Sequence, residues 1–184
     1  VAGCPVGALT LRAGKVVWEE SRCAGCDQCI HVCPHHASCK VIELTPEALL
    51  DRVAETFPFI QGITVSGGEC MLYAEFLTEF FRLVKAAGKT CLIDSNGMVD
   101  FRQYPELLQL CDGVMLDMKA IDDDFHRQLT GASNRQVLDN LTLLLEAGKL
   151  EEVRTVLLPE FSEQNQKTVR GVNERLQGKI RYKL

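Results

Sequence analysis

Short apolar segments alternate with longer amphipathic segments along the chain after residue 45. The short segments are apolar on both faces, which is typical of strands buried in a parallel sheet. They predict five strands, at residues 62–65, 91–94, 114–117, 153–158 and 180–184, about 25 residues apart. The amphipathic segments predict helices at residues 73–87, 104–111, 135–147 and 164–177, after a first helix that opens at Thr45 and Pro46.

This alternation is the pattern of βα units, in which helices cover a parallel sheet. The predicted fold class is therefore α/β. Because the chain stops within the fifth strand, we expect the sheet or barrel to be incomplete at that end. Asn134 is expected to cap the helix at 135–147 with its side chain.

The first 44 residues have a different character. Residues 8–11 and 16–18 flank a polar segment containing Gly14 and predict a short hairpin. Six of the nine cysteines lie in the first 39 residues, and the composition changes near Thr45. We expect a small cysteine-rich module at residues 1–44 and a larger body at residues 45–184.

Composition and charge narrow the class of protein. The 184 residues are 46% apolar, with 20 Lys and Arg against 25 Asp and Glu, a formal charge of −5 and a pI near 5.4. This acidic balance argues against nucleic-acid binding, and no apolar run is long enough to span a membrane. Nine cysteines fit metal or cluster ligation in a reducing compartment, so a cytoplasmic location is expected. Because Val1 is neither an initiator Met nor part of a signal peptide, we expect an internal fragment or a processed product.

The strongest motif is a ferredoxin-type cysteine run. Cys23, Cys26, Cys29 and Cys33, followed by proline, have the CxxCxxCxxxCP spacing that holds [4Fe–4S] clusters. In two-cluster ferredoxins the fourth cysteine of a run binds the other cluster. The segment that begins at Cys4 resembles the end of a second such run. We therefore expect Cys4, Cys23, Cys26 and Cys29 to hold one cluster, with Cys33 belonging to a second, partial set.

Two alternatives for the cysteine run stay open. A zinc site usually separates its two CxxC pairs by a longer loop, and a disulfide network suits a reducing compartment poorly. Cys39 is expected to be a free thiol, and Cys70, Cys91 and Cys111 are expected to be buried thiols, since none has paired spacing.

Polar residues follow three successive predicted strands. They belong to the segments Ser66-Gly67-Gly68-Glu69, Asp94-Ser95-Asn96-Gly97 and Asp117-Met118-Lys119. Each segment has an ordinary explanation on its own: a tight turn, an Asx turn or a surface ion pair. Together they place charges at the carboxyl ends of parallel strands, where α/β proteins build ligand sites.

Two further residues carry weaker expectations. Arg154 lies among apolar strand residues, so either a ligand pocket or an edge ion pair would explain it. His126 lies in a polar helical stretch and is expected to be solvated.

The combination of a double ferredoxin-type insert with GITVSGGE, CLIDSNG, VMLDMKA and VRTVLLP resembles the glycyl-radical-enzyme activating enzymes. These are radical S-adenosylmethionine (SAM) proteins, and the subgroup with ferredoxin inserts is the most similar. The resemblance implies a partial (β/α)6 barrel, of which five strands are present, with a small ferredoxin-like [4Fe–4S] module at its N-terminus.

The resemblance also implies ligand contacts. Gly67, Gly68 and Glu69 match the segment that holds the methionyl amino group of SAM. The two later strand ends lie near the methionyl carboxylate in the family, and their aspartates can help hold a monovalent cation. Arg154 matches a basic residue near SAM. The matching strand-end positions are Asp94, Ser95, Asn96, Asp117 and Lys119.

One departure from the family is the lack of a CxxxCxxC, the ligand set of the catalytic cluster, in these residues. We therefore expect no catalytic residue in this chain, and a fragment that is inactive alone. The intact protein would form a 5′-deoxyadenosyl radical and install a glycyl radical on a partner enzyme, with a flavodoxin- or ferredoxin-type electron donor. The alternatives are a ferredoxin-like electron carrier fused to a ligand-binding barrel, and another radical SAM enzyme acting on a small molecule.

Overall fold

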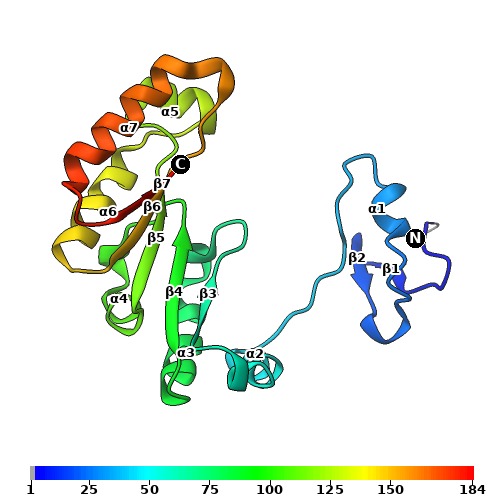
Figure 1. Cartoon of the computed structure of the whole chain (residues 1–184). Helices are drawn as coiled ribbons and strands as arrows, with labels where there is room; N and C mark the ends of the chain where they lie inside the picture. Colours follow the sequence, from blue (N-terminus) through cyan, green and yellow to red (C-terminus); the bar gives the residue numbers. More distant parts are fainter. Residues whose placement is uncertain (1–2) are drawn as a thin grey trace. The chain divides into compact units, whose positions relative to one another are not determined.

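The computed structural model describes residues 3–184 and divides the chain into two compact units, one ending at Leu44 and one covering Thr45–Leu184. In the first unit, strands β1 (Leu9–Arg12) and β2 (Lys15–Trp18) form an antiparallel hairpin (Figure 1). The hairpin predicted at residues 8–18 is therefore present, with its strands shifted by about one residue. A short helix, α1 (Gln28–His31), lies within the cysteine run.

The second unit contains a five-stranded sheet in the order β3-β4-β5-β6-β7, and every neighbouring pair is parallel. Its strands are β3 (Gly62–Val65), β4 (Thr90–Ser95), β5 (Gly113–Asp117), β6 (Leu150–Arg154) and β7 (Arg181–Lys183). Its helices are α2 (Pro46–Ala54), α3 (Ala74–Ala86), α4 (Pro105–Leu110), α5 (Asp123–Thr130), α6 (Arg135–Glu146) and α7 (Ser162–Leu176). The predicted α/β fold class is confirmed.

Two elements differ from the sequence prediction. Strand β6 begins and ends earlier than the predicted 153–158, because Arg154 is its last residue with partners in both β5 and β7. For α5, the sequence indicated only a polar helical stretch around His126, without bounds. The first turn of α5 is capped by Asp122, whose carboxylate accepts the Phe125 N–H at 2.8 Å, and it ends at Gly131, whose φ is 79°.

The two faces of the sheet differ in polarity because side chains alternate along each strand. On one face Ile93, Leu116 and Val153 are fully buried. They pack with apolar residues of the covering helices, which include Leu77, Phe81, Leu107, Leu141, Leu144, Val172 and Leu176. This apolar core fixes the strands in register.

The opposite face of the sheet carries charged residues near the strand ends. Cross-strand pairing aligns Asp94 with Met115, Met115 with Glu152, and Asp117 with Arg154. Residues paired in this way project to the same side of a sheet. The fold therefore gathers charges from β4, β5 and β6 on the face that the core does not use.

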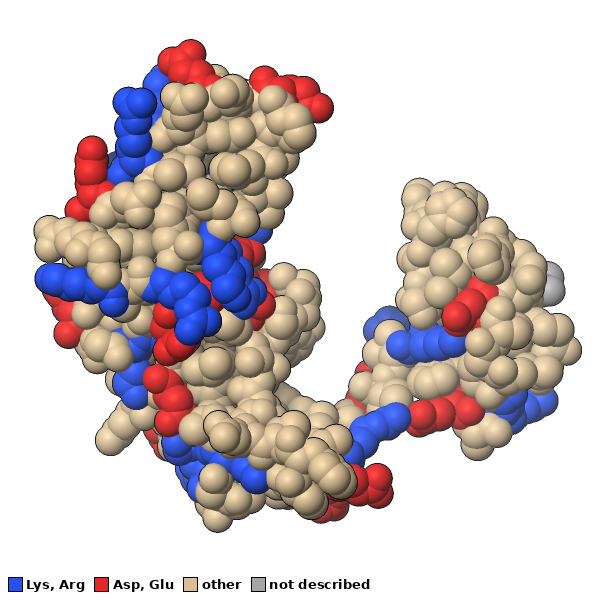
Figure 2. Space-filling model, in the orientation of Figure 1, with Lys and Arg blue, Asp and Glu red and all other residues tan. Residues whose placement is uncertain are grey.

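Positive and negative side chains are interspersed on the face of the second unit seen in Figure 2. Within residues 3–184, no helix is both long and apolar enough to cross a membrane.

The core should tolerate truncation of Phe81 poorly. Phe81 is fully buried, so Phe81→Ala leaves a cavity and should lower the free energy of unfolding by about 3–5 kcal/mol. Phe59, which is 87% exposed in the same unit, is the matched control, and Phe59→Ala should leave stability nearly unchanged. Urea unfolding followed by circular dichroism measures both. Equal losses for the two variants would contradict this assignment of the core.

Candidate functional site

Four cysteines of the first unit surround one cavity. Cys4, Cys23, Cys26 and Cys29, the set predicted for one cluster, all line it together with Trp18. All four are free thiols. The cavity has a volume of about 20 Å³. Within residues 3–184, no group of three or more His, Cys, Asp or Glu side chains could hold a single metal ion.

Nitrogen donors around these thiols favour negative charge on sulfur. The Ala8 N–H donates to Cys4 Sγ at 3.2 Å. Desolvation opposes ionisation of Cys4, but backbone N–H groups that include those of Val6 and Ala8 outweigh it and lower its pKa. The Gly25 N–H is the main cause of the lowered pKa of Cys23. Hydrogen bonds of this kind stabilise thiolates, which are the form that binds iron. The donor set therefore fits a [4Fe–4S] cluster.

Cys33 lies outside that group and lines a separate cavity of about 280 Å³ with Cys29 and Cys39. The Ala37 N–H is the main cause of the lowered pKa of Cys33. Burial instead raises the pKa of Cys39. The second, partial cluster proposed for Cys33 stays a prediction.

The three isolated cysteines of the second unit are buried, as expected. Desolvation raises the pKa of Cys70 and Cys111 to about 11 and that of Cys91 to about 12. These thiols are protonated at neutral pH, which suits core residues rather than ligands.

The Gly-Gly-Glu segment begins directly after β3. Gly67 has φ of 127°, a conformation that residues with a side chain rarely adopt. A Cβ atom added to Gly67 or Gly68 would meet nothing within 4 Å, so open space adjoins this backbone. The turn directs Glu69 toward the neighbouring strand end.

Glu69 joins the ends of β3 and β4 through its carboxylate. Oε1 accepts the Ser95 hydroxyl at 2.9 Å, and Oε2 accepts the Asn96 N–H at 2.8 Å. Oε1 also accepts the Met71 N–H at 3.0 Å. Asn96 Oδ1 accepts the Met98 N–H, so the Asx turn considered from sequence is present as well.

A buried asparagine anchors the loop that follows β4. The Asn140 side chain donates to the carbonyl oxygens of Gly97 and Val99, both at 2.8 Å, and accepts the Phe101 N–H at 3.2 Å. Gly97 has φ of 73°, and a Cβ there would lie 2.7 Å from Leu116 Cδ1. The backbone beside Asn96 is therefore held tightly against the core.

Arg154 forms ion pairs with two carboxylates on the charged face of the sheet. Its Nη1 lies 2.9 Å from Asp94 Oδ2, and its Nε lies 2.6 Å from Glu152 Oε1. Its Nη2 lies 2.8 Å from Met115 Sδ. From the sequence, either a ligand pocket or an edge ion pair would explain Arg154. In the described residues Arg154 forms ion pairs.

Glu152 is the most buried member of this network, with its side chain 2% exposed. Besides Arg154, it contacts Lys183 at 3.0 Å and Arg181 at 3.4 Å. Desolvation opposes its ionisation, but Arg154 and Lys183 outweigh this effect and lower the pKa of Glu152. The carboxylate therefore joins β6 to β7 and orients Arg154.

Asp117 and Lys119 form an ion pair of 2.6 Å at the end of β5. Lys119 and Asn96, from different strand ends, also line a common cavity of about 180 Å³. The remaining lining residues are Met98, His126, Thr130 and Ala132. The second and third strand-end motifs therefore meet at one place, whereas the first contacts the second through Glu69.

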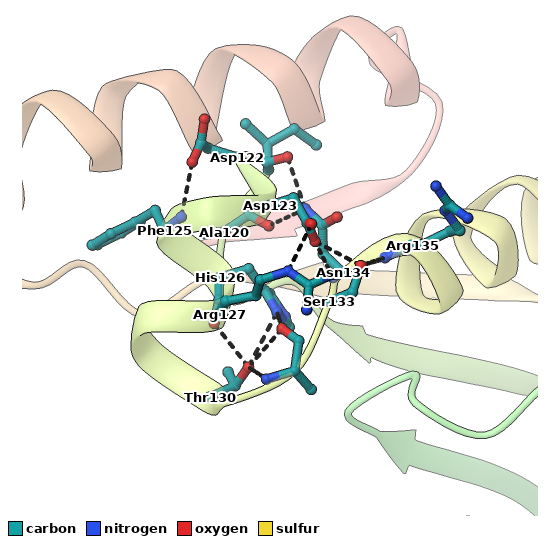
Figure 3. Close-up of polar contacts among 12 residues, drawn as sticks. Ala120, Asp122, Asp123, Phe125, His126, Arg127, Thr130, Ser133, Asn134 and Arg135 are labelled. Carbon is teal, nitrogen blue, oxygen red and sulfur yellow. Dashed lines mark hydrogen bonds and ion pairs between the residues drawn. The ribbon is translucent and has the colours of Figure 1, made fainter.

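The segment from α5 to α6, whose polar contacts are drawn in Figure 3, contributes His126, Thr130 and Ala132 to the lining of this cavity. Asp123 accepts the Ser133 hydroxyl at 2.7 Å and the Asn134 N–H at 2.8 Å. Asn134 is the N-cap residue of α6, as expected from sequence, but its side chain does not make the capping hydrogen bond. Its amide instead donates to the carbonyl oxygens of Ala120 and Ile121.

The expectation of a solvated His126 is wrong, since only 2% of this residue is exposed. Its Nδ1 lies 2.8 Å from the Ala132 carbonyl oxygen, which can only accept, so Nδ1 carries the proton (Figure 3). Thr130 lies 3.2 Å from the same nitrogen. The hydrogen bond from the His126 imidazole thus connects α5 to the loop between α5 and α6.

Sequence reasoning also missed Glu152, Met115 and Trp18 as site residues. Two of the cationic partners of Glu152, Arg181 and Lys183, lie on another strand and give no local signal. The spacing of two residues between Glu152 and Arg154 would place both on one face of a strand, but the predicted strand began only at residue 153.

Parallel strands ending in a Gly-Gly-Glu turn, a carboxylate-bound Arg and an Asp–Lys pair, together with a cysteine-lined cavity, define a class of protein. The chain belongs to the radical SAM superfamily, whose family model matches residues 20–171. The comparison agrees with the predicted resemblance, and it does not favour an electron carrier fused to a binding barrel.

Curated relatives include the pyruvate formate-lyase 1-activating enzyme of Escherichia coli (strain K12), 36% identical over 129 residues, covering 66% of this chain and 52% of that protein. The trans-4-hydroxy-L-proline dehydratase activating enzyme of Clostridioides difficile is 28% identical over 184 residues, covering 78% and 59%. The chain thus spans about half the length of these relatives.

A solved structure supports the fold. It is a domain of pyruvate-formate lyase-activating enzyme from Bacteroides vulgatus ATCC 8482, with a TM-score of 0.57 and 23% identity. The match covers 67% of this chain and 76% of that one. It agrees with a partial radical SAM barrel.

The Asp123 contacts predict a pH dependence of stability. The Ser133 hydroxyl and the Asn134 N–H hold the pKa of Asp123 at about 2, below its ordinary 3.8. A depressed pKa stabilises the fold above pH 3.8, and this stabilisation is lost as the pH falls toward 2. Asp123→Asn should therefore lower the urea midpoint at pH 7, and the difference from wild type should narrow between pH 4 and pH 2.

Urea unfolding of the cluster-free chain at several pH values measures this effect. The exposed Asp124, one position along the same helix, gives the control Asp124→Asn. A constant difference between wild type and Asp123→Asn down to pH 2 would contradict the assignment.

Proposed function

We propose that this chain provides a SAM-binding surface and an electron-transfer cluster for a glycyl-radical-enzyme activase. The observation that carries the proposal is the linkage of Glu69 to Ser95 and Asn96 at the same sheet edge where Arg154 pairs with Asp94. A methionyl group is zwitterionic, so its binding needs a carboxylate for the amino group and cations for the carboxylate. The sheet edge supplies both.

Glu69 is the proposed partner of the methionyl amino group, with the backbone of Gly67 and Gly68 allowing close approach. Lys119 and the Asn96 region are proposed to face the carboxylate. Asp94 and Asp117 are proposed to share a monovalent cation beside it. In this arrangement the guanidinium of Arg154 compensates the negative charge of Asp94 when the monovalent cation is not bound.

A reduced [4Fe–4S] cluster supplies the electron that cleaves SAM to methionine and a 5′-deoxyadenosyl radical. The 184 residues contain no CxxxCxxC, so none of them is assigned as a ligand of that catalytic cluster. Cys4, Cys23, Cys26 and Cys29 are instead proposed to hold a cluster that relays electrons from a flavodoxin- or ferredoxin-type donor.

The proposed partner is a glycyl radical enzyme, one of whose backbone glycines loses a hydrogen atom to the 5′-deoxyadenosyl radical. The proposal is supported by relatives named as activating enzymes, one of which is named a putative glycyl-radical enzyme activating enzyme. The reducing conditions that free thiols and such clusters need are those of the cytoplasm, where we place the protein.

SAM binding should depend on the charge of Glu69. Glu69→Gln keeps the side-chain shape and an acceptor oxygen but removes the charge that pairs with the amino group. We expect the Kd for SAM to rise about tenfold, corresponding to about 1.4 kcal/mol. Isothermal titration calorimetry of the chain measures it.

Glu75, an exposed residue in the first turn of α3, provides the control Glu75→Gln, which should bind as wild type does. If Glu69→Gln has a normal circular dichroism spectrum and binds SAM with the wild-type Kd, the proposed contact between Glu69 and the methionyl amino group is wrong. No binding by the wild-type chain would contradict the SAM-binding surface itself.

Iron incorporation should distinguish the two kinds of cysteine. After anaerobic reconstitution, the wild-type chain should hold about four irons and show charge-transfer absorbance. Cys26→Ser should lose both, whereas Cys91→Ala, which removes a buried core thiol, should keep them. Iron analysis and absorbance spectra measure this. Copurified zinc with no incorporation of iron would contradict the cluster.

A further inference from the structure

The indole nitrogen of Trp18 is a buried donor without an acceptor. Among residues 3–184, Trp18 Nε1 is the one buried side-chain nitrogen or oxygen atom that makes no hydrogen bond. Buried polar groups are almost always paired, so an unpaired N–H calls for a physical explanation. Leaving such a donor unsatisfied destabilises the folded chain.

The surroundings of Trp18 indicate which acceptor would satisfy it. Trp18 lines the cavity that Cys4, Cys23, Cys26 and Cys29 also line. The indole N–H therefore adjoins a cavity lined by four cysteine sulfurs, and its geometry completes no hydrogen bond within the described residues.

The hairpin fixes Trp18 at this place. Trp18 is the last residue of β2 and pairs with Leu9, the first residue of β1. Leu9 is buried and lines the same cavity. The hairpin thus connects the segment carrying Cys4 to the loop carrying Cys23, and holds the indole between them.

We propose that the Trp18 indole N–H donates a hydrogen bond to a sulfur of the bound [4Fe–4S] cluster, at or beside Cys23, and thereby raises its reduction potential. This inference rests on the proposed cluster at Cys4, Cys23, Cys26 and Cys29. The other donors to these sulfurs are backbone N–H groups, as at Ala8 and Gly25, so Trp18 supplies a side-chain donor that evolution or mutation can remove.

The direction of the effect follows from charge. One-electron reduction adds one negative charge to the cluster, and the sulfur atoms share it. A hydrogen bond to sulfur stabilises the reduced form more than the oxidised form, because charge-assisted hydrogen bonds are the stronger ones. Loss of the bond should therefore make reduction less favourable.

The test compares Trp18→Phe with the wild-type chain after anaerobic reconstitution. Phenylalanine keeps an aromatic ring but has no N–H. We expect unchanged iron content and a midpoint potential that is lower by about 59 mV, equivalent to a tenfold change in the equilibrium constant for one-electron reduction. A dithionite titration followed by electron paramagnetic resonance measures the potential.

Val6 provides a matched control, since it lines the same cavity and offers no side-chain donor. Val6→Ala should change the packing around the cluster and leave the potential close to the wild-type value. Because Trp18 is the single tryptophan of the chain, its fluorescence should also be quenched when the cluster is incorporated.

The outcomes separate this inference from the proposed cluster. Normal iron content in Trp18→Phe with an unchanged potential would overturn the role of Trp18 and leave the cluster intact. An equally large lowering of the midpoint potential in Val6→Ala would show that packing causes the effect, and it would also overturn the role of Trp18. Failure of the wild-type chain to incorporate iron would overturn both the cluster and the role of Trp18.

Discussion

The charged face of the parallel sheet depends on the mutual neutralisation of its side chains. A buried carboxylate is expensive unless cations compensate it, and Glu152 is almost fully buried. Its compensation comes from Arg154 on its own strand and from Arg181 and Lys183 on β7. Arg154 also forms an ion pair with Asp94. The network that compensates the buried charge of Glu152 therefore also compensates a charge at the end of the neighbouring strand β4.

The parallel strands were predictable because their signal is local. Apolar runs such as the one ending at Ile93, at regular spacing between amphipathic segments, identify buried strands without knowledge of their partners. Strand β6 was misplaced for the opposite reason. Glu151 and Glu152 both lie in β6 although they interrupt its apolar pattern, and the buried Glu152 is compensated partly by cations of β7 that lie far away in sequence.

The candidate site was predictable to a similar extent. Glycine and acidic residues at strand ends indicated a shared sheet edge, and the contacts from Glu69 to Ser95 and Asn96 are consistent with it. His126 was misjudged because its helix is polar in sequence, whereas in the folded chain the residue is buried and its ring contacts the Ala132 carbonyl of the following loop. Trp18 carried no signal at all, since an unpaired N–H is a property of the folded chain.

The anchoring of the loop after β4 has a consequence for ligand affinity. Three hydrogen bonds from Asn140 and the close packing of Gly97 restrict this backbone before any ligand arrives. Ordering a loop on binding costs conformational entropy, which subtracts from the affinity. Here that entropy is already lost during folding. A molecule that contacts the backbone of Asn96 therefore meets a preorganised surface, and more of its interaction energy is retained as affinity.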